Sequence, residues 1–295
     1  MSNTNSDINH KKETNKQQVA STPLNVLIYS HNIRYDTKKL MEGEQPWSVR
    51  KQGVIESIKQ TSSNPNLPAI VCLQEVLYNQ LQDILHGLGS DWEYVGVGRD
   101  DGGKQGEFSP ILYNKYDWEK PIFSKTSWLS ETPDRPSKSW DAALKRIVTN
   151  VYLKNSRVQD KSINVFNTHF DHRGEEARKQ SALLIVKLMT ESNEVNKSVL
   201  TGDLNSEPSS KGYQTLIKYL QESGVDAQKI EGERRTCTGF SNGGDGESII
   251  DFIWTTKNVP ILYHTTQKQY CGGGGVGSQG YLCSDHRPVI AIVQI

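Results

Sequence analysis

The sequence predicts an α/β protein in which β-sheets are covered by helices within one domain. From Leu24 onward, short β-branched or apolar runs alternate with segments of helical spacing. Residues 92–128 lack helical spacing and are rich in aromatic residues, which favours antiparallel strands and hairpins. No Pro- or Ser-rich linker divides the chain, so we expect one domain over residues 23–295, preceded by a disordered polar tail over residues 1–22.

Each element is predicted from its own periodicity. The segments that we expect to form strands are Leu24–Ser30, Ala69–Gln74, Ile147–Leu153, Ile163–Thr168, Val199–Asp203, Ile249–Trp254 and Pro288–Val293. Apolar residues recur at helical spacing in Trp47–Gln60, Val76–Leu88, Gly174–Thr190 and Ser209–Leu220. Strands and helices therefore alternate along most of the chain.

The charge balance excludes some classes of function. The chain has 34 Lys and Arg residues against 34 Asp and Glu residues, so its formal net charge is zero. This argues against a protein that holds duplex DNA or an anionic membrane by bulk electrostatic attraction. A hydrophobic content of 35% also excludes a highly charged disordered chain.

The termini and cysteines predict a cytoplasmic protein. The polar N-terminal tail has no apolar core of a signal peptide, and no apolar run is long enough for a membrane helix. Four cysteines are too few for a disulfide framework in 295 residues, and we expect Cys72 to be a buried thiol. Whether Cys271 pairs with Cys283 stays open.

One glycine motif points away from a nucleotide cofactor. Gly275–Gly280 has the G-x-G-x-x-G spacing, but no strand precedes it and no helix opens on it. We expect a loop here, which leads toward Asp285 and His286 and forms a rim over the site.

Polar residues gather where the predicted strands end. Glu75, Asp203 and Asp285 are hard oxygen donors at the ends of different strands, and Asn32 and Asn205 are neutral neighbours. Carboxylates and amides without a cysteine ligand are the donor set that Mg²⁺ or Mn²⁺ prefers. His169 and His286 are placed to hydrogen-bond phosphate oxygens, and Asp251 to orient one of these histidines. The pattern indicates metal-assisted chemistry at phosphorus.

The order of these motifs resembles the endonuclease/exonuclease/phosphatase superfamily, which has the deoxyribonuclease I-like fold, and within it a branch of metal-dependent hydrolases. The matching pieces are Asn32, Gln74-Glu75-Val76, Thr168-His169-Phe170, Gly202-Asp203-Leu204-Asn205, Ile250-Asp251-Phe252 and Ser284-Asp285-His286. The branch is indicated by Phe108–Tyr113, Trp128–Pro133, Ser139–Ile147 and Thr168–Gln180. The resemblance implies a four-layered α/β/β/α sandwich, with two mixed sheets face to face and helices outside.

The resemblance also implies roles for single residues. Glu75 is the expected principal ligand of Mg²⁺, for which Mn²⁺ is a plausible substitute, and Asn32 and Asp285 complete or support the metal site. Asp203 orients or deprotonates the attacking water, and Asn205 positions a phosphate oxygen. The catalytic residues implied in this way are His169, Asp203, Asn205, Asp251 and His286.

The predicted activity is hydrolysis of a phosphoester by in-line attack of water on phosphorus. A phosphodiester or a small phosphorylated metabolite is the expected substrate, and a nuclease or a noncatalytic binding module that retains the fold are the alternatives. Nucleic acid is not favoured by the net charge, and no protein partner is predicted. Phosphates need cationic partners, and the candidates for substrate binding are Arg34, Arg146, Arg173, Trp140 and Asp141, with Lys145 and Arg178 as further cations.

Overall fold

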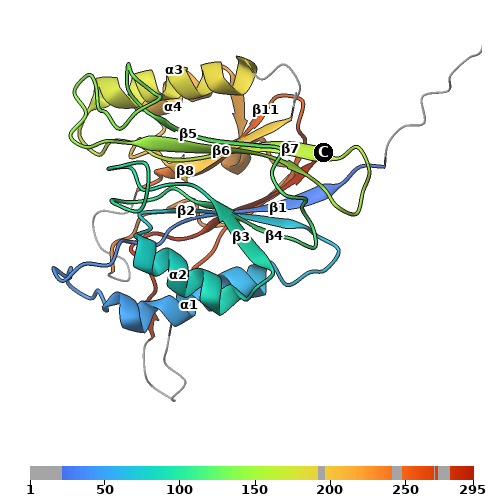
Figure 1. Cartoon of the computed structure of the whole chain (residues 1–295), viewed down its shortest axis with the longest axis horizontal. Helices are drawn as coiled ribbons and strands as arrows, with labels where there is room; N and C mark the ends of the chain where they lie inside the picture. The colour runs from blue at the N-terminus through green and yellow to red at the C-terminus, as the bar shows by residue number, and fades with distance from the viewer. Residues whose placement is uncertain (1–21, 192–196, 241–247, 269, 272–279) are drawn as a thin grey trace, which may run out of the picture.

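Two mixed β-sheets pack face to face with helices on both outer faces, as the computed structural model shows (Figure 1). The structure describes residues 22–191, 197–240, 248–268, 270–271 and 280–295. The predicted tail, except residue 22, and most of the glycine-rich loop over Gly275–Gly280 lie outside these ranges. The predicted four-layered sandwich is confirmed.

The first sheet has seven strands in the order β10-β12-β15-β1-β2-β4-β3. Their bounds are β1 (Asn25–Asn32), β2 (Ala69–Gln74), β3 (Trp92–Val95), β4 (Ile111–Asn114), β10 (Lys229–Gly232), β12 (Ile261–Thr266) and β15 (Val289–Gln294). Helices α1 (Trp47–Thr61) and α2 (Tyr78–Leu88) cover its outer face, seen below the sheet in Figure 1.

The second sheet has six strands in the order β5-β6-β7-β8-β11-β9. These are β5 (Phe123–Trp128), β6 (Ile147–Lys154), β7 (Ser162–His169), β8 (Ser198–Asp203), β9 (Leu220–Glu222) and β11 (Asp251–Thr256). Helices α3 (Glu175–Glu191) and α4 (Lys211–Leu216) cover its outer face. The remaining elements are the short helix α5 (Ser223–Asp226) and the hairpin of β13 (Tyr270–Cys271) and β14 (Tyr281–Leu282).

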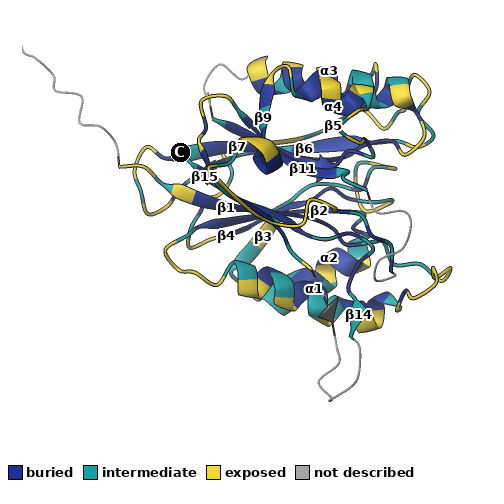
Figure 2. Cartoon of the chain, turned by 180° about the vertical axis from the view of Figure 1, so that it is seen from behind, coloured by how far each residue is buried: buried dark blue, intermediate teal, exposed yellow. Residues whose placement is uncertain are grey.

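Three apolar clusters separate the four layers. One lies between the two sheets and includes Ile28, Ile70 and Val165. The second joins the first sheet to α1 and α2, and the third joins the other sheet to α3 and α4. Figure 2 shows the same arrangement, since buried residues fill the strands while exposed residues lie on the outer faces of the helices.

Two helix predictions were too long, α4 at both ends and α2 at its start. Helix α4 ends at Leu216, not Leu220, because Leu220 belongs to β9 and pairs with Thr256 of β11. Helix α2 begins at Tyr78, not Val76, because Val76 forms a β-bridge with Phe108. In both cases a strand contact distant in sequence outweighs helical spacing. Within the described residues, no helix has the length and apolar character needed to cross a membrane.

The cysteines divide into free and bonded residues. Cys72 is a buried free thiol, as predicted, and Cys237 is also free. Cys283 is disulfide-bonded, while the side chain of Cys271 lies outside the described part of the chain.

Candidate active site

The topology brings the predicted strand ends to one edge of the sandwich. In the first sheet β1 and β2 are parallel, and Asn32 pairs in register with Gln74, the residue before Glu75. In the second sheet β7 and β8 are parallel, so His169 lies beside Asp203. Strand β11 runs antiparallel to β8 and places its first residue, Asp251, opposite Asp203. Each sheet therefore supplies half of the site.

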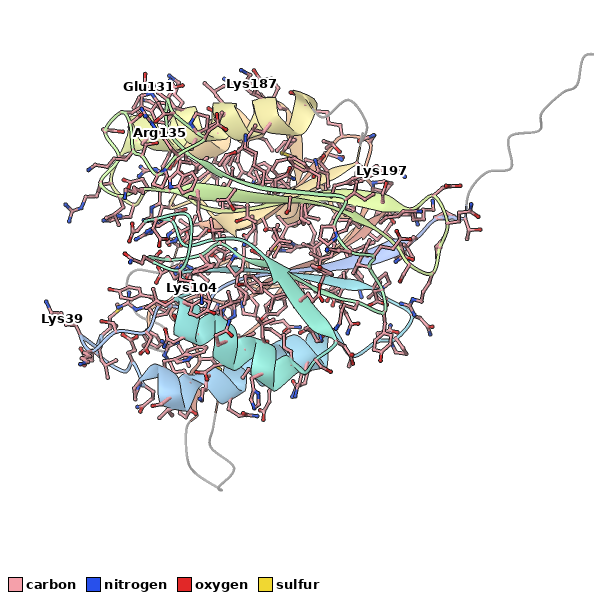
Figure 3. The ribbon with its side chains drawn as sticks, viewed as in Figure 1. Lys39, Lys104, Glu131, Arg135, Lys187 and Lys197 are labelled. Carbon is pink, nitrogen blue, oxygen red and sulfur yellow. The ribbon has the colours of Figure 1, made fainter. Side chains whose placement is uncertain are left out.

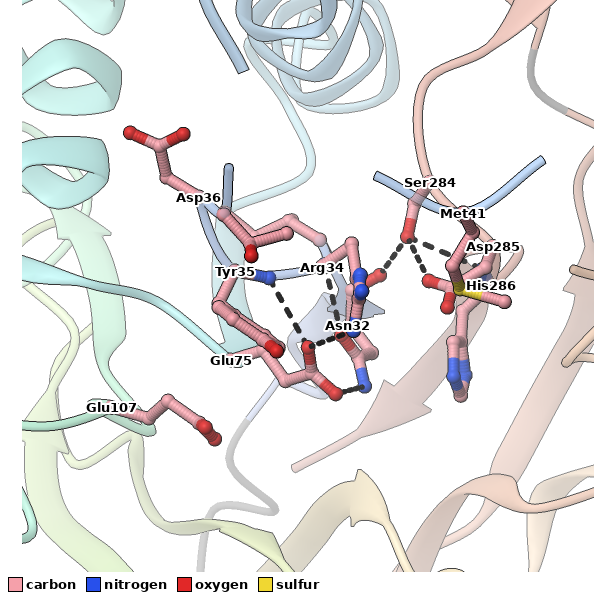
Figure 4. A network of polar contacts seen from close by, with 12 residues as sticks. Asn32, Arg34, Tyr35, Asp36, Met41, Glu75, Glu107, Ser284, Asp285 and His286 are labelled. Carbon is pink, nitrogen blue, oxygen red and sulfur yellow. Dashed lines mark hydrogen bonds and ion pairs between the residues drawn. The ribbon is translucent and has the colours of Figure 1, made fainter. Parts of the chain in front are cut away.

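Asn32 joins these two halves. Its Nδ2 donates to Glu75 Oε1 at 3.1 Å and to Asp203 Oδ2 at 3.0 Å. The backbone N–H of Arg34 donates to Asn32 Oδ1 at 3.0 Å, which turns the amide nitrogen toward the carboxylates (Figure 4). In this arrangement Asn32 holds the two acids in fixed orientations.

Several site residues have strained backbones. Glu75 and Asn205 have φ values of 59° and 45°, in the left-handed region that side-chain-bearing residues rarely adopt. Arg34 has a φ of 58°. Such strain costs about 1–3 kcal/mol per residue and clusters at functional sites. Glu75 is held there by Asn32 and by the N–H of Tyr35, which donates to Oε2 at 3.1 Å.

His286 and Asp251 form a buried pair. His286 Nδ1 lies 2.8 Å from Asp251 Oδ2, and His286 Nε2 lies 3.8 Å from Asp203 Oδ2. Burial lowers the pKa of His286, but the Asp251 and Asp203 carboxylates outweigh it and raise this pKa well above its ordinary value. We therefore expect His286 to be an imidazolium at neutral pH.

The pKa of His169 is shifted in the opposite direction to that of His286. Burial, with the nearby Arg146 guanidinium, lowers the pKa of His169 to about 3, so it is neutral. Asn205 Nδ2 lies 3.0 Å from His169 Nε2, and an amide nitrogen donates, so Nε2 accepts. The ring proton is then on Nδ1. Asp203 thus lies between a charged and a neutral imidazole, with His169 Nε2 3.5 Å from its Oδ2.

Glu107 is a site residue that the sequence analysis missed. Its Oε2 lies 3.7 Å from His169 Nδ1, and its carboxylate forms a two-point ion pair with Arg99, both contacts being 2.8 Å. Glu107 follows no predicted strand, and only the bridge between Val76 and Phe108 brings it beside the site. Its position next to the Phe108–Tyr113 motif is the one signal in the sequence.

A family model for the endonuclease/exonuclease/phosphatase family matches residues 29–286, a range that contains all the site residues described above. The chain belongs to this family. Solved structures of the family superpose over nearly the whole chain. An endonuclease/exonuclease/phosphatase family protein from Bacteroides thetaiotaomicron is 28% identical, with a TM-score of 0.84, and the match covers 93% of this chain and 99% of that one. A search of curated proteins gives no match.

Two further structures extend this comparison. An endonuclease/exonuclease/phosphatase from Bacteroides vulgatus is 35% identical with a TM-score of 0.80, covering 91% of this chain and 98% of that one. A mannosyl-6-phosphatase from Bacteroides thetaiotaomicron is 28% identical with a TM-score of 0.82, covering 91% and 99%. The family likeness therefore spans the complete sandwich.

The divalent cation expected for this family member fits the oxygen donors around Glu75. Burial raises the pKa of Asp285, and the Glu75 carboxylate raises it further, against the effect of His286. Acids that repel one another in this way are stabilised by a bound cation. Hard oxygen donors and the absence of a cysteine among them suit Mg²⁺ or Mn²⁺.

A second acidic group fits a metal less well. Asp203, Asp251 and His286 have ligand atoms within 4.8 Å of one another. However, His286 Nδ1 is already engaged with Asp251 Oδ2 at 2.8 Å, so this pair has fewer free ligand atoms for a metal. We therefore assign the proposed metal to Glu75 and Asp285, with Asn32 in support.

The predicted substrate-binding cations differ in how free they are. The side chain of Arg34 forms ion pairs of 3.4 Å with Glu44 and 3.9 Å with Glu75. Arg146 is buried, 3.9 Å from Glu107 and 3.8 Å from Asp171, and two of its nitrogens lack a hydrogen-bond partner. Arg173 is exposed on the loop before α3. The other two predicted cations contact backbone oxygens, Lys145 that of Asp100 and Arg178 that of Asp171.

The Asp141 carboxylate accepts hydrogen bonds from the backbone of α3. Its two carboxylate oxygens accept hydrogen bonds from Glu176 N at 3.2 Å and Ala177 N at 2.7 Å. These are N–H groups of the first helical turn, which have no partner within a helix. The neighbouring Trp140 is 36% exposed and has a φ of 56°. The structure does not bring the Asp141 carboxylate into the cluster around Asp203.

Asp141→Ala is expected to lower the midpoint of urea denaturation with kcat/KM unchanged, because it removes the acceptor for the first N–H groups of α3. Urea denaturation and steady-state kinetics measure the two quantities. Asp141→Asn is the matched control, since its amide oxygen keeps one acceptor for the helix N–H groups. A loss of kcat/KM at unchanged stability in Asp141→Ala would instead support the predicted substrate contact.

Proposed function

We propose that this protein is a divalent-metal-dependent phosphoester hydrolase that acts on a small phosphorylated metabolite. The observation that carries the proposal is the environment of Asp203, whose Oδ2 lies near Asn32, His169 and His286. One buried carboxylate faces both a neutral imidazole and a charged one. This arrangement suits a carboxylate that acts as a general base while the neighbouring groups stabilise the negative charge that develops on the phosphoryl oxygens.

Each residue then has a separate role. Asp203 takes a proton from the attacking water, and burial together with Asp251 raises its pKa, which makes it a better proton acceptor. His286, held by Asp251, offers Nε2–H to a phosphoryl oxygen. Arg146, two of whose nitrogens lack a hydrogen-bond partner, binds another phosphoryl oxygen, and Asn205 orients His169. A cation held by Glu75 and Asp285 would neutralise phosphate charge and polarise phosphorus when bound.

The net charge and a similar solved structure favour a small substrate over nucleic acid. The net charge is zero, and Figure 3 shows Lys39, Lys104, Lys187 and Lys197 at separate places around the molecule. A polyanion requires a clustered basic surface. The similar mannosyl-6-phosphatase also supports a sugar phosphate as the class to test first.

A phosphoester panel tests the proposal. The panel contains mannose 6-phosphate, p-nitrophenyl phosphate, bis-p-nitrophenyl phosphate and a labelled single-stranded oligonucleotide, each with Mg²⁺, Mn²⁺ or EDTA. We expect hydrolysis of a small ester with Mg²⁺, loss of activity in EDTA and recovery when Mg²⁺ is restored. Cleavage of the oligonucleotide alone would establish the nuclease alternative, and no cleavage with any metal would refute the proposed function.

A further inference from the structure

Four central strands each turn one face toward the other sheet. Along each strand, the residues on this face are first apolar and then polar toward the active site. On β7 the inward residues are Ile163, Val165, Asn167 and His169, and on β8 they are Val199, Thr201 and Asp203. On β1 they are Val26, Ile28, Ser30 and Asn32, and on β2 they are Ile70, Cys72 and Gln74. The apolar residues thus give way to a polar residue two positions before Asn32, His169 and Asp203, and on β2 directly before Glu75.

We call Ser30, Gln74, Asn167 and Thr201 the polar layer. All four are at most 1% exposed. Gln74 Nε2 donates to Asn167 Oδ1 at 2.7 Å and lies 3.2 Å from Ser30 Oγ, while Thr201 Oγ1 donates to Asn167 Oδ1 at 3.1 Å. The contact between Gln74 and Asn167 joins the first sheet to the second.

The Asn167 side chain makes further hydrogen bonds that hold it against the first sheet. Its Nδ2 donates across the gap to Leu73 O of β2 at 2.8 Å and to Pro110 O, directly before β4, at 2.9 Å. Asn167 uses its oxygen and nitrogen at once, so its amide cannot turn without losing several hydrogen bonds. The two sheets are therefore held at a defined spacing at this point.

The polar layer is not the arrangement that would maximise stability. Gln74 Oε1 is buried without a hydrogen-bond partner, which is a cost that an apolar side chain of similar size avoids. Apolar packing between the sheets is also non-directional and sets no register by itself. The directional contacts occur where the catalytic half-sites must meet.

We propose that the polar layer is a positioning device that sets the distance between the two halves of the active site, with Gln74 and Asn167 as its central pair. Gln74 directly precedes Glu75, and Asn167 lies two residues before His169 on the same face of β7. The role in catalysis rests on the function proposed above. A displacement of about 1 Å between reacting groups can lower a rate about 10²-fold.

An exchange of side-chain lengths tests this proposal. Gln74→Asn shortens the contact by one methylene and Asn167→Gln lengthens it by one, so the double variant keeps the summed length. We expect each single variant to lower kcat by about 10- to 100-fold with little change in KM. The double variant is expected to recover at least tenfold of that loss. Failure of the double variant to recover activity would refute a role in spacing.

Two further variants separate position from stability. Gln74→Met removes the hydrogen bonds and the unpartnered oxygen, and we expect its Tm to equal or exceed that of the wild type while kcat falls. Ile163→Val is the matched control on the same face of β7 but at its far end, and we expect a lower Tm with kcat unchanged. If Gln74→Met keeps its kcat, the polar layer is structural only and the proposal is wrong.

A crystal structure gives a readout that does not depend on hydrolysis. In Gln74→Asn we expect the contact between Asn32 Nδ2 and Asp203 Oδ2, now 3.0 Å, to lengthen beyond hydrogen-bond range. An unchanged contact overturns the positioning role even if no substrate is cleaved. Inactivity of the wild-type enzyme with an altered contact in the variant would refute the proposed function and leave the spacing role supported.

Discussion

Asp203→Asn is expected to lower kcat by about 10³-fold while the fold is retained. General-base catalysis contributes about 10²–10⁴ to a rate, and the amide has nearly the same shape as the carboxylate but cannot take a proton at neutral pH. Asp203 is 2% exposed, so bulk water cannot take over its function as the proton acceptor without rearrangement of the site. Its Oδ1 also accepts from the N–H of Asn205 at 2.8 Å, which orders the loop that carries the amide in contact with His169.

Single-turnover kinetics with the best substrate of the panel measure this loss, and far-UV circular dichroism checks the fold. Asp134→Asn is the matched control, because Asp134 pairs with Lys125 on the surface and is 77% exposed as a side chain. A decrease of less than tenfold in Asp203→Asn would assign the general base to another residue.

Glu75→Gln is expected to weaken Mn²⁺ binding by more than tenfold and to lower kcat/KM by about 10²- to 10³-fold at fixed Mg²⁺. The substitution removes the negative charge and keeps one oxygen, which can serve either the N–H of Tyr35 or Asn32 Nδ2, since these donors use different oxygens of the carboxylate. A hard divalent cation binds a neutral amide oxygen more weakly than an anionic carboxylate oxygen. The loss is expected to shrink as the Mg²⁺ concentration is raised.

Isothermal titration with Mn²⁺ and activity measured against metal concentration test this expectation. Glu119→Gln serves as the control, since Glu119 is a surface residue paired with Lys154 at 3.7 Å. If Glu75→Gln binds Mn²⁺ like the wild type while Asp251→Asn does not, the metal belongs to the second acidic group.

The central strands could be predicted from the sequence because they are buried on both faces. Strand β2 (Ala69–Gln74) is buried at every position and has the continuous apolar pattern that marks such strands. Strands β10 and β12 were not predicted. Every residue of β10 is exposed, and such a strand exists only because its backbone pairs with β12.

The candidate site was predictable where chemistry follows a strand end. Glu75, His169 and Asp203 end or directly follow predicted strands, Asn32 lies two residues after one, and the fold brings them together with Asp251, which lies inside the predicted strand Ile249–Trp254. Asp141 illustrates the limit, because an acid beside an aromatic residue has the same sequence pattern whether it binds substrate or caps a distant helix. Its hydrogen bonds to α3 join residues 35 and 36 positions apart.

By itself the sequence determined the fold class, the family resemblance and the set of polar residues at the strand ends, since these depend on local periodicity and residue order. Only the tertiary structure decided which side chains share hydrogen bonds and which charges they carry. Glu107 reaches His169 through a bridge between loops, and the opposite pKa shifts of His169 and His286 arise from burial and from carboxylates on other strands. Such contacts join residues far apart in the chain, and burial and charge act through space.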